Sequence, residues 1–342
     1  MSEGIVDKAA GTLLLLLLLT IKGFSQNVQE PSVQIMFYNV ENLFDVYDDT
    51  LTEDEEFLPS GIRRWNTSRY YNKLNSLQKT ILAAGEWSPP AIVAFCEIEN
   101  RKVLGDLIYR TNLSKHNYRI VHEDSPDPRG IDVCLIYRDD FVELIEFKYF
   151  KPHAVENEKF STRSVLYARC VIVNDTLDIL VNHWPSRRGG VLAAKDQRMM
   201  IAEMTRMKAD SILAANGSEG KLIVLGDFNA APDDQVIGIL TGNDSSGSEM
   251  INLSDSLEKG SGTYRYKGTW EMIDQVIVSK SLLQNERGVY CTPEMLSVFK
   301  PEFLLRKDTK YPGISPFSTW SGYRYTGGFS DHLPVLLELR VR

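Results

Sequence analysis

A recurring junction between an apolar run and a polar group most constrains what this chain can fold into. Short runs rich in β-branched and aromatic residues, typical of buried strands, lead into polar side chains or follow them. The junctions are Tyr38–Asn39, Cys96–Glu97, Asn182–His183, Leu225–Gly226, Asp274–Gln275 and His332–Leu333. Rigid strands hold side chains in place at their ends, where open sheets gather ligand sites. The pattern therefore favours a functional site built at strand ends.

The apolar runs alternate with helical stretches through the middle of the chain. Periodicity predicts strands at Val33–Tyr38, Ala91–Cys96, Ile131–Tyr137, Val142–Phe150, Val165–Val173, Leu177–Val181, Lys221–Leu225, Ile273–Val278 and Val335–Val341, and helices at Ser68–Ala84, Val103–Arg110 and Leu192–Ala215. Such alternation, with strand pairs elsewhere, predicts an α/β protein with a mixed sheet system and helices outside. No segment has the composition of a linker, so we expect one domain over residues 26–342.

The N-terminus carries an apolar segment, Thr12–Ile21, that is almost pure leucine and is followed by Lys22. The segment is too short to span a bilayer, which needs about 20 apolar residues. Gly23 and Ser25 suit a signal-peptidase site. A buried core helix is the alternative, but the run opens the chain and a polar stretch follows it. We therefore expect residues 1–25 to be a signal peptide, the protein to be periplasmic or secreted, and no stable membrane anchor to be present.

Composition narrows the class of protein. The formal net charge of -8 at pH 7 argues against a protein whose main activity is to coat nucleic acid. It is compatible with an enzyme whose bound cation supplies positive charge at the site. Cys96, Cys134, Cys170 and Cys291 lack the spacing of a zinc site, and we expect buried free thiols, with a disulfide as the alternative.

Each polar junction has an ordinary structural interpretation when it is taken alone. Glu97 could be a cap or turn former, His183 a hydrogen-bonded core residue, and Asp331–His332 a turn before the last strand. The segment GDFN-x-x-P is more specific, because its glycine permits a tight backbone path and Asp227 and Asn229 can act from one loop.

Taken together, the motifs resemble a known family. YNVEN, FCEIE, NHWPS, GDFNAAP, the W-x-x-I-D segment at Trp270–Asp274 and SDHLP occur in the order found in the endonuclease/exonuclease/phosphatase superfamily. That superfamily includes pancreatic-type deoxyribonucleases, abasic-site repair endonucleases, neutral sphingomyelinases and inositol-polyphosphate 5-phosphatases. The resemblance extends over residues 33–341. It implies a four-layer α/β/β/α sandwich of two mixed sheets flanked by helices, with the site at one edge of the sheets.

The resemblance also implies a metal site. Glu97 resembles the family's metal-binding glutamate, Asn39 lies beside it, and Asp331 resembles a metal or water-network residue. Hard oxygen ligands of this kind hold Mg²⁺ or Mn²⁺, which neutralises the anionic oxygens that repel a nucleophile from a phosphodiester. Glu41 is given a supporting role only.

The implied catalytic residues come from the remaining motifs. Asp227 resembles the aspartate that orients or deprotonates the attacking water, with Asn229 its partner on the phosphate. Asp274 and His332 resemble the family's carboxylate–histidine pair, in which the carboxylate fixes the tautomer and favours the cation. His183 resembles a second histidine of the deoxyribonuclease and sphingomyelinase branches, which the repair endonucleases lack. The donors among these residues would stabilise the pentacovalent charge.

These features predict a divalent-metal-dependent phosphoesterase, first of all a nuclease-like phosphodiesterase that uses water as the nucleophile. A phosphatase or a sphingomyelinase-type lipid phosphodiesterase is the alternative. A non-catalytic binding module is a third reading, against which the presence of every expected catalytic residue type argues. We expect a phosphate-ester substrate, with nucleic acid as a candidate, and a monomeric protein.

Two surface features bear on the substrate. A nucleic-acid enzyme should carry a basic rim, for which the candidates are Arg63, Arg64, Arg187, Arg188, Arg306, Lys307 and Lys310. Arg187 and Arg188 follow the His183 loop and either contact phosphate or are solvated surface residues. Tyr311–Phe329, rich in aromatics and glycine, is expected either to wall the substrate site or to fold onto its own aromatics.

Overall fold

A computed structural model of the chain describes residues 31–86, 88–152, 161–187, 191–242, 250–258, 260–284 and 287–342. Ser32–Arg342 form one compact unit. The expected signal peptide over residues 1–25 and the candidate Arg188 lie outside the described residues. Among the described helices, none combines the length and apolar composition that crossing a bilayer requires.

The first sheet has seven strands and mixed direction. Its order is β13-β19-β1-β2-β4-β3, and β14 also pairs with β19. The central strand β1 runs parallel to β2 and antiparallel to β19. The strands are β1 (Ser32–Leu43), β2 (Ile92–Ile98), β3 (Tyr118–Val121), β4 (Asp132–Arg138), β13 (Val289–Tyr290), β14 (Leu296–Val298) and β19 (Val335–Val341).

The second sheet has six strands in the order β5-β6-β7-β8-β12-β9. Strands β7 and β8 are parallel, and β12 runs antiparallel to β8. The strands are β5 (Val142–Phe150), β6 (Val165–Ile172), β7 (Asp175–His183), β8 (Leu222–Asp227), β9 (Met250–Asn252) and β12 (Asp274–Ser279).

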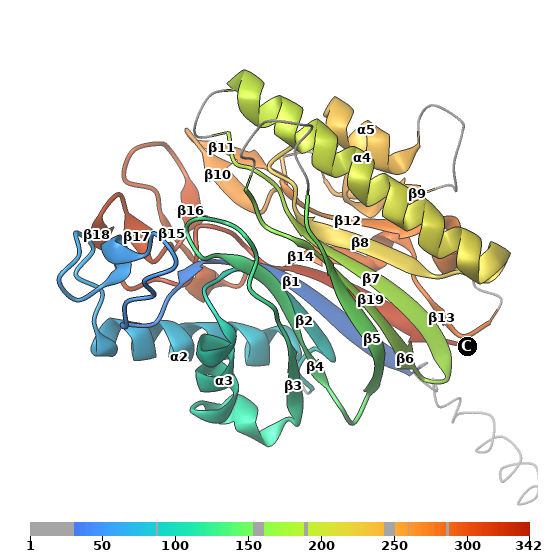
Figure 1. The fold of residues 1–342 in the computed structure, drawn as a ribbon, viewed down its shortest axis with the longest axis horizontal. Coiled ribbons are helices and arrows are strands. Elements are labelled where there is room, and N and C mark those ends of the chain that lie inside the picture. Colours follow the sequence, from blue (N-terminus) through green and yellow to red (C-terminus); the bar gives the residue numbers. More distant parts are fainter. Residues whose placement is uncertain are drawn as a thin grey trace, which may run out of the picture. The chain divides into compact units, whose positions relative to one another are not determined.

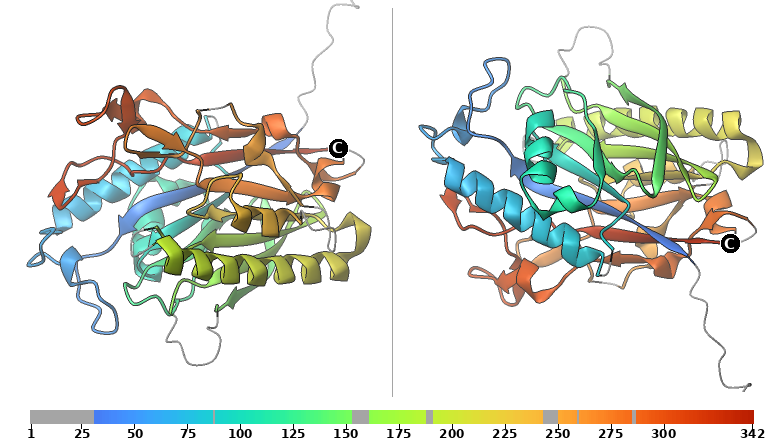
Figure 2. Two further views of the ribbon diagram at one scale, coloured as in Figure 1. Left: turned by 90° about the horizontal axis from the view of Figure 1, so that it is seen from above. Right: turned by 90° about the horizontal axis from the view of Figure 1, so that it is seen from below.

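Helices cover the outer face of each sheet (Figures 1 and 2). Strand β1 shows why, since successive side chains point to opposite faces. Val33, Ile35 and Phe37 join the core between the sheets, whereas Met36 and Tyr38 join the core under α2 and α3. A separate core lies under α4 and α5. The helices are α2 (Thr67–Ala84), α3 (Arg101–Tyr109), α4 (Val191–Asn216) and α5 (Gln235–Thr241). The predicted four-layer α/β/β/α sandwich is confirmed.

Every strand and helix predicted from periodicity is present, with ends shifted by a few residues. The sequence pattern missed β3, β9, β13, β14, α5 and three short hairpins, which have too few apolar residues to show a period. The hairpins are β10 (Tyr264–Tyr266) with β11 (Thr269–Glu271), β15 (Leu305–Lys307) with β16 (Ile314–Pro316), and β17 (Trp320–Ser321) with β18 (Arg324–Tyr325). All four cysteines are buried with free thiols, as expected.

The Tyr311–Phe329 segment folds largely onto aromatic rings, which was one of the two alternatives. The ring of Trp320 lies 5.5 Å from that of Tyr325, and the ring of Phe317 lies 6.1 Å from that of Phe329. Trp320 and Phe329 are buried. Most of this segment therefore packs into hydrophobic cores, Trp320 into the one under α2 and α3 and Phe329 into a smaller one, rather than forming a wall of the active site.

Candidate active site

The strand-end residues converge on one cavity of about 490 Å³. The predicted site residues that line it are Glu97, His183, Arg187, Asp227, Asn229, Asp331 and His332. Asn39 and Asp274 do not line the cavity but hydrogen-bond to residues that do. The structure thus brings together every predicted site residue that it describes.

Strand register explains part of this convergence. Asp227, the last residue of β8, lies opposite His183 on β7 and opposite Asp274 on β12. Three adjacent strands therefore place these residues in one row. Gly226 makes the row possible, since its φ is +155° and a Cβ there would lie 2.1 Å from the Asn182 carbonyl oxygen.

Backbone irregularities place two further site residues. Glu97 has a φ of +63° and lies where the pairing of β2 with β4 shifts register between Cys96 and Ile98. Asn229 has a φ of +48°. Left-handed conformations of non-glycine residues cost on the order of 1–3 kcal/mol each and concentrate at functional sites. The fold thus holds both side chains at the cavity in conformations that a regular strand would not adopt.

The amide of Asn39 joins two carboxylates. Its Nδ2 donates to Asp227 Oδ2 at 3.1 Å and to Glu97 Oε1 at 3.4 Å. Its Oδ1 accepts from the backbone N–H of Glu41 at 3.0 Å, and Glu97 Oε2 accepts from the backbone N–H of Asn42 at 2.9 Å. Asn39 therefore orients the carboxylates, and Glu97 keeps its 17% exposed side chain at the cavity.

Glu41 acts away from the cavity. Its carboxylate accepts hydrogen bonds from the backbone N–H groups of Thr319 and, at 3.1 Å, Trp320. Burial and then the charge of Asp331 raise the pKa of Glu41 to about 8, against the opposing charge of Lys73. Glu41 thus ties the Thr319 segment to β1, which suits the supporting role expected for it.

His332 and Asp274 form a buried pair. His332 Nδ1 lies 2.7 Å from Asp274 Oδ2, and His332 Nε2 lies 4.0 Å from Asp227 Oδ2. Burial lowers the pKa of His332, but the charges of Asp274 and Asp227 outweigh it and raise that pKa well above its usual range. These charges therefore favour the imidazolium form, which can donate a proton or a hydrogen bond into the cavity.

The SDH turn is fixed by its serine. Ser330 Oγ donates to the Asn39 carbonyl oxygen at 2.7 Å and accepts from the His332 backbone N–H at 3.1 Å. The ring of Tyr264 packs on His332, with centroids 4.9 Å apart. The last motif is thus anchored to β1 on one side and to β10 on the other.

Asp227 is a carboxylate that can take up a proton near neutral pH. It is 2% exposed, and its Oδ1 accepts from the Asn229 backbone N–H at 2.9 Å. Burial and then the charge of Asp274 raise the pKa of Asp227 to about 7, with His332 acting in the opposite direction. A carboxylate tuned in this way is suited to act as a general base.

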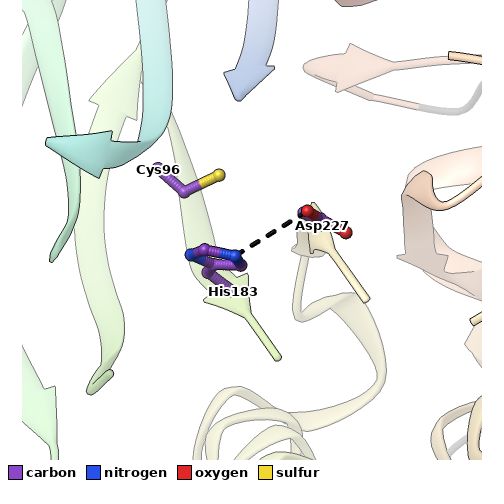
Figure 3. Close-up of side chains that lie close together, drawn as sticks. All are labelled: Cys96, His183 and Asp227. Atoms are coloured by element: carbon purple, nitrogen blue, oxygen red, sulfur yellow. Dashed lines mark ion pairs between the residues drawn. The ribbon is translucent and has the colours of Figure 1, made fainter. Parts of the chain in front are cut away.

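His183 lies beside Asp227, as Figure 3 shows, with its Nε2 3.8 Å from Asp227 Oδ2 and 3.9 Å from Glu97 Oε1. Burial and the charges of Arg163 and Arg129 lower the pKa of His183 well below its usual range. The two histidines of the site therefore differ: the surroundings favour the cationic form of His332 and the neutral form of His183.

Comparison with known proteins identifies the family. The model of the endonuclease/exonuclease/phosphatase family matches residues 34–341, almost the whole described chain. The chain belongs to this family. Its members are divalent-metal-dependent hydrolases of phosphoric esters, so the chain is an enzyme of that class. By sequence, no curated protein matches the chain.

Solved structures of the endonuclease/exonuclease/phosphatase family share the fold. TDP2 of D. rerio, complexed with a single-strand DNA product, superposes with a TM-score of 0.56 at 13% identity, covering 91% of this chain and 100% of that one. The human Nocturnin catalytic domain with bound sulfate has a TM-score of 0.53 at 14% identity, with coverage of 92% and 96%. A family protein of Bacteroides thetaiotaomicron gives 0.55 at 14%, with coverage of 92% and 96%.

The side chains present suit the hard divalent cation on which the family depends. Glu97, Asp227 and Asp331 bring carboxylate oxygens to the cavity, and Asp274 Oδ1 is buried without a hydrogen-bond partner. Mg²⁺ or Mn²⁺ would offset the negative charge of these clustered carboxylates. Cys96 also lies within metal-ligand reach of His183 and Asp227. Burial raises the pKa of its thiol well above the usual range, so the protonated sulfur does not suit a hard cation.

Two cavity arginines of this family member were not predicted from its sequence. Arg163 is 6% exposed, and it donates to Asp127 Oδ2 at 3.1 Å and to the Trp184 carbonyl oxygen at 2.8 Å. Arg129 contacts the other oxygen of Asp127 at 3.4 Å. Arg129 lies shortly before β4, and Arg163 lies shortly before β6. A search for basic as well as acidic residues near strand ends would therefore have found both.

The side chain of Arg187 is held by contacts within the protein and is not free to reach a phosphate. Its Nε donates to the Asn229 carbonyl oxygen at 3.2 Å, and its Nη1 lies 3.3 Å from Glu271 Oε2. It therefore links the NHWPS loop to the GDFN loop and to β11 at the rim of the cavity.

Proposed function

We propose that the chain is a divalent-metal-dependent, nuclease-like phosphodiesterase that cleaves P–O bonds by attack of water. The observation that carries the proposal is the position of Asp227. Its carboxylate lies 4.0 Å from the imidazole of His332 and shares the Asn39 amide with Glu97. A base, an acid and a cation ligand thus surround one cavity.

Each residue has a role that its environment supports. Asp227 accepts the proton of the attacking water, because its raised pKa makes it a competent base. His332, held by Asp274, donates to the oxygens on which charge develops, and neutral His183 and Asn229 add further donors. A divalent cation held by Glu97 and Asp331 would neutralise phosphate charge and lower the barrier to attack.

Two observations favour nucleic acid over the other phosphodiesters. Arg129 and Arg163, which share the single carboxylate of Asp127, leave a net positive charge at the cavity, where a polyanion would bind. Tyr264 and the half-exposed Tyr266 offer aromatic rings on the β10–β11 hairpin, and bases stack on such rings. The complex of TDP2 with a single-strand DNA product shows that a protein of this fold accommodates such a strand.

A phosphatase is the second candidate, because the same two arginines would also suit the dianion of a phosphate monoester. The purified mature protein should be tested with Mg²⁺ or Mn²⁺ against bis(p-nitrophenyl) phosphate, p-nitrophenyl phosphate, single- and double-stranded DNA, RNA, sphingomyelin and phosphoinositides. The proposal requires diester hydrolysis with nucleic acid preferred. Hydrolysis of monoesters alone would contradict it.

We also propose that the protein is exported. The apolar run that precedes Gly23 and Ser25 supports cleavage before Gln26. N-terminal sequencing of the protein from its native host should start close to Gln26. A cytosolic protein that retains Ser2 would refute this.

A further inference from the structure

A second cavity, of about 200 Å³, adjoins the active-site cavity. The two cavities share Tyr264 and Asp331 as lining residues. The walls of the second cavity come from the β10–β11 hairpin and from the β15–β16 hairpin with its connecting loop, which lie side by side because β10 packs against β16 (Figure 1). A substrate that occupies the first cavity can therefore extend directly into the second.

The second cavity is basic. Arg265, Lys267, Arg306 and Lys310 line it, against the acids Asp308 and Asp331. Arg265 is a structural residue: it is paired with Asp308 at 2.9 Å and donates to the Pro312 carbonyl oxygen at 2.5 Å. In the described part of the chain, no carboxylate forms an ion pair with any of the other three bases. Two of the seven rim candidates, Arg306 and Lys310, thus converge here, joined by Lys267, which the sequence did not suggest.

Hydrogen bonds and close packing hold the loop that carries Lys310 and the strand that carries Arg306 in place. Asp308 Oδ1 accepts from the backbone N–H groups of Lys310 at 2.7 Å and Tyr311 at 3.1 Å. Gly268, with a φ of +87°, lets the hairpins approach, since a Cβ there would lie 3.0 Å from Tyr311 Cβ. Arg306 Nη2 donates to Ser318 Oγ at 2.9 Å, which fixes its guanidinium at the cavity wall.

We propose that this second cavity binds the phosphate next to the scissile one in a nucleic-acid strand. The inference rests on the proposed phosphodiesterase function. A diester with a single phosphate would leave the three bases unused, and a choline headgroup would be repelled by them. A strand places a second anion beside the scissile phosphate, and Tyr311, 39% exposed, offers a ring beside the bases.

The test compares two oligothymidylates with wild-type enzyme and a variant in which Arg306→Gln and Lys310→Gln are combined. In one oligonucleotide all linkages are phosphodiesters, and in the other the linkages on both sides of a single phosphodiester are neutral methylphosphonates. Wild-type kcat/KM should fall at least about tenfold on the second substrate, and the variant should lose most of that discrimination. Lys115→Gln with Lys300→Gln also removes two positive charges, from exposed positions outside both cavities, and should behave like wild type.

Hydrolysis of bis(p-nitrophenyl) phosphate, which has a single phosphate, distinguishes failure of the second-phosphate site from failure of the proposed function. The variant should hydrolyse it at the wild-type rate, which also shows that the variant is folded. Equal discrimination by variant and wild type, or none by wild type, would overturn the second-phosphate site while leaving the phosphodiesterase in place. Preference for a phosphorylated inositol would overturn the assignment to a nucleic-acid strand. Inactivity of the wild type on every diester would instead overturn the proposed function.

Discussion

Among the residues that the structure describes, two buried histidine–aspartate pairs occur, and one of these two faces the active-site cavity. His332 Nδ1 lies 2.7 Å from Asp274, and His122 Nε2 lies 2.9 Å from Asp132. In the second pair, the other oxygen of Asp132 accepts from the Ser125 backbone N–H at 2.8 Å. In the first pair, the other oxygen of Asp274 has no partner. The residue types and the distances within the two pairs are alike, but only the aspartate of the second pair has hydrogen-bond partners for both of its carboxylate oxygens.

The difference is the reason to expect catalysis from His332 rather than from His122: the surroundings of the first pair leave charge unsatisfied. His332 faces the buried carboxylate of Asp227, whereas the nearest further acid to His122 is Asp124, 3.9 Å away with an 87% exposed side chain. Both sets of three residues are spaced closely enough to hold a metal. We expect that the first pair serves chemistry and that the second holds the segment carrying Arg129 to β4.

Metal dependence should give the largest contrast. A chelator should abolish hydrolysis of any accepted substrate, and Mg²⁺ or Mn²⁺ should restore it, because the carboxylates at the cavity need a cation to accept an anionic phosphate. Glu97→Gln should weaken Mn²⁺ binding measured by calorimetry. Asp124→Asn, beside His122, should not. Full activity in metal-free buffer would disprove the metal site.

Catalysis should separate the two histidines next. His332→Ala and Asp227→Asn should each lower kcat at least about a hundredfold, since each removes an acid–base or electrostatic contribution. His122→Ala is the matched control and should change kcat little, because His122 lines neither cavity and Arg129 keeps its ion pair with Asp127. Steady-state kinetics on bis(p-nitrophenyl) phosphate with saturating metal provides the measurement. Equal losses at His332 and His122 would erase the distinction.

Double variants test whether Asp227 and His332 act together while His122 and His332 act independently. Residues that act as a unit are non-additive, so Asp227→Asn combined with His332→Ala should be scarcely slower than the slower single variant. His122→Ala combined with His332→Ala should instead multiply the two separate effects, because the histidines share no partner. A double-mutant cycle in kcat/KM tests both pairs. Strict additivity between Asp227 and His332 would argue against a shared phosphate.

Differences in the free energy of unfolding should be the smallest effect. Here the substitution in the His122–Asp132 pair should cost more than the substitution at the active site. Asp132→Asn disturbs a satisfied buried pair and should cost about 1–3 kcal/mol of unfolding free energy. Asp227→Asn should keep or increase stability in metal-free buffer at neutral pH. The pKa of Asp227 is higher in the folded protein than in the unfolded chain. At any pH above the unfolded-state pKa, the ionised carboxylate therefore lowers the free energy of unfolding. Urea titrations of the metal-free proteins measure these free energies. An Asp227→Asn variant that is less stable than Asp132→Asn would contradict the prediction.

Much of the fold could be predicted because it follows from local patterns. The alternation in β1 assigns Phe37 to one core and Tyr38 to the other, and each site motif lies directly before or after a strand. Asp227 and His332 were therefore recognisable as site residues. The hairpins β10–β11 and β15–β16 were not, because their few residues lack a readable period.

The sequence by itself determined the longer strands, three of the four described helices and the polar residues at their ends, since these depend on side-chain chemistry at fixed spacing. Tertiary structure alone decided which of those residues meet. Pairing between β7, β8 and β12 aligned His183, Asp227 and Asp274, and the left-handed backbone of Glu97 turned its carboxylate toward them. The physical reason is that register and backbone strain are set by partners far away in the chain, and the pKa values follow from the burial that those partners create.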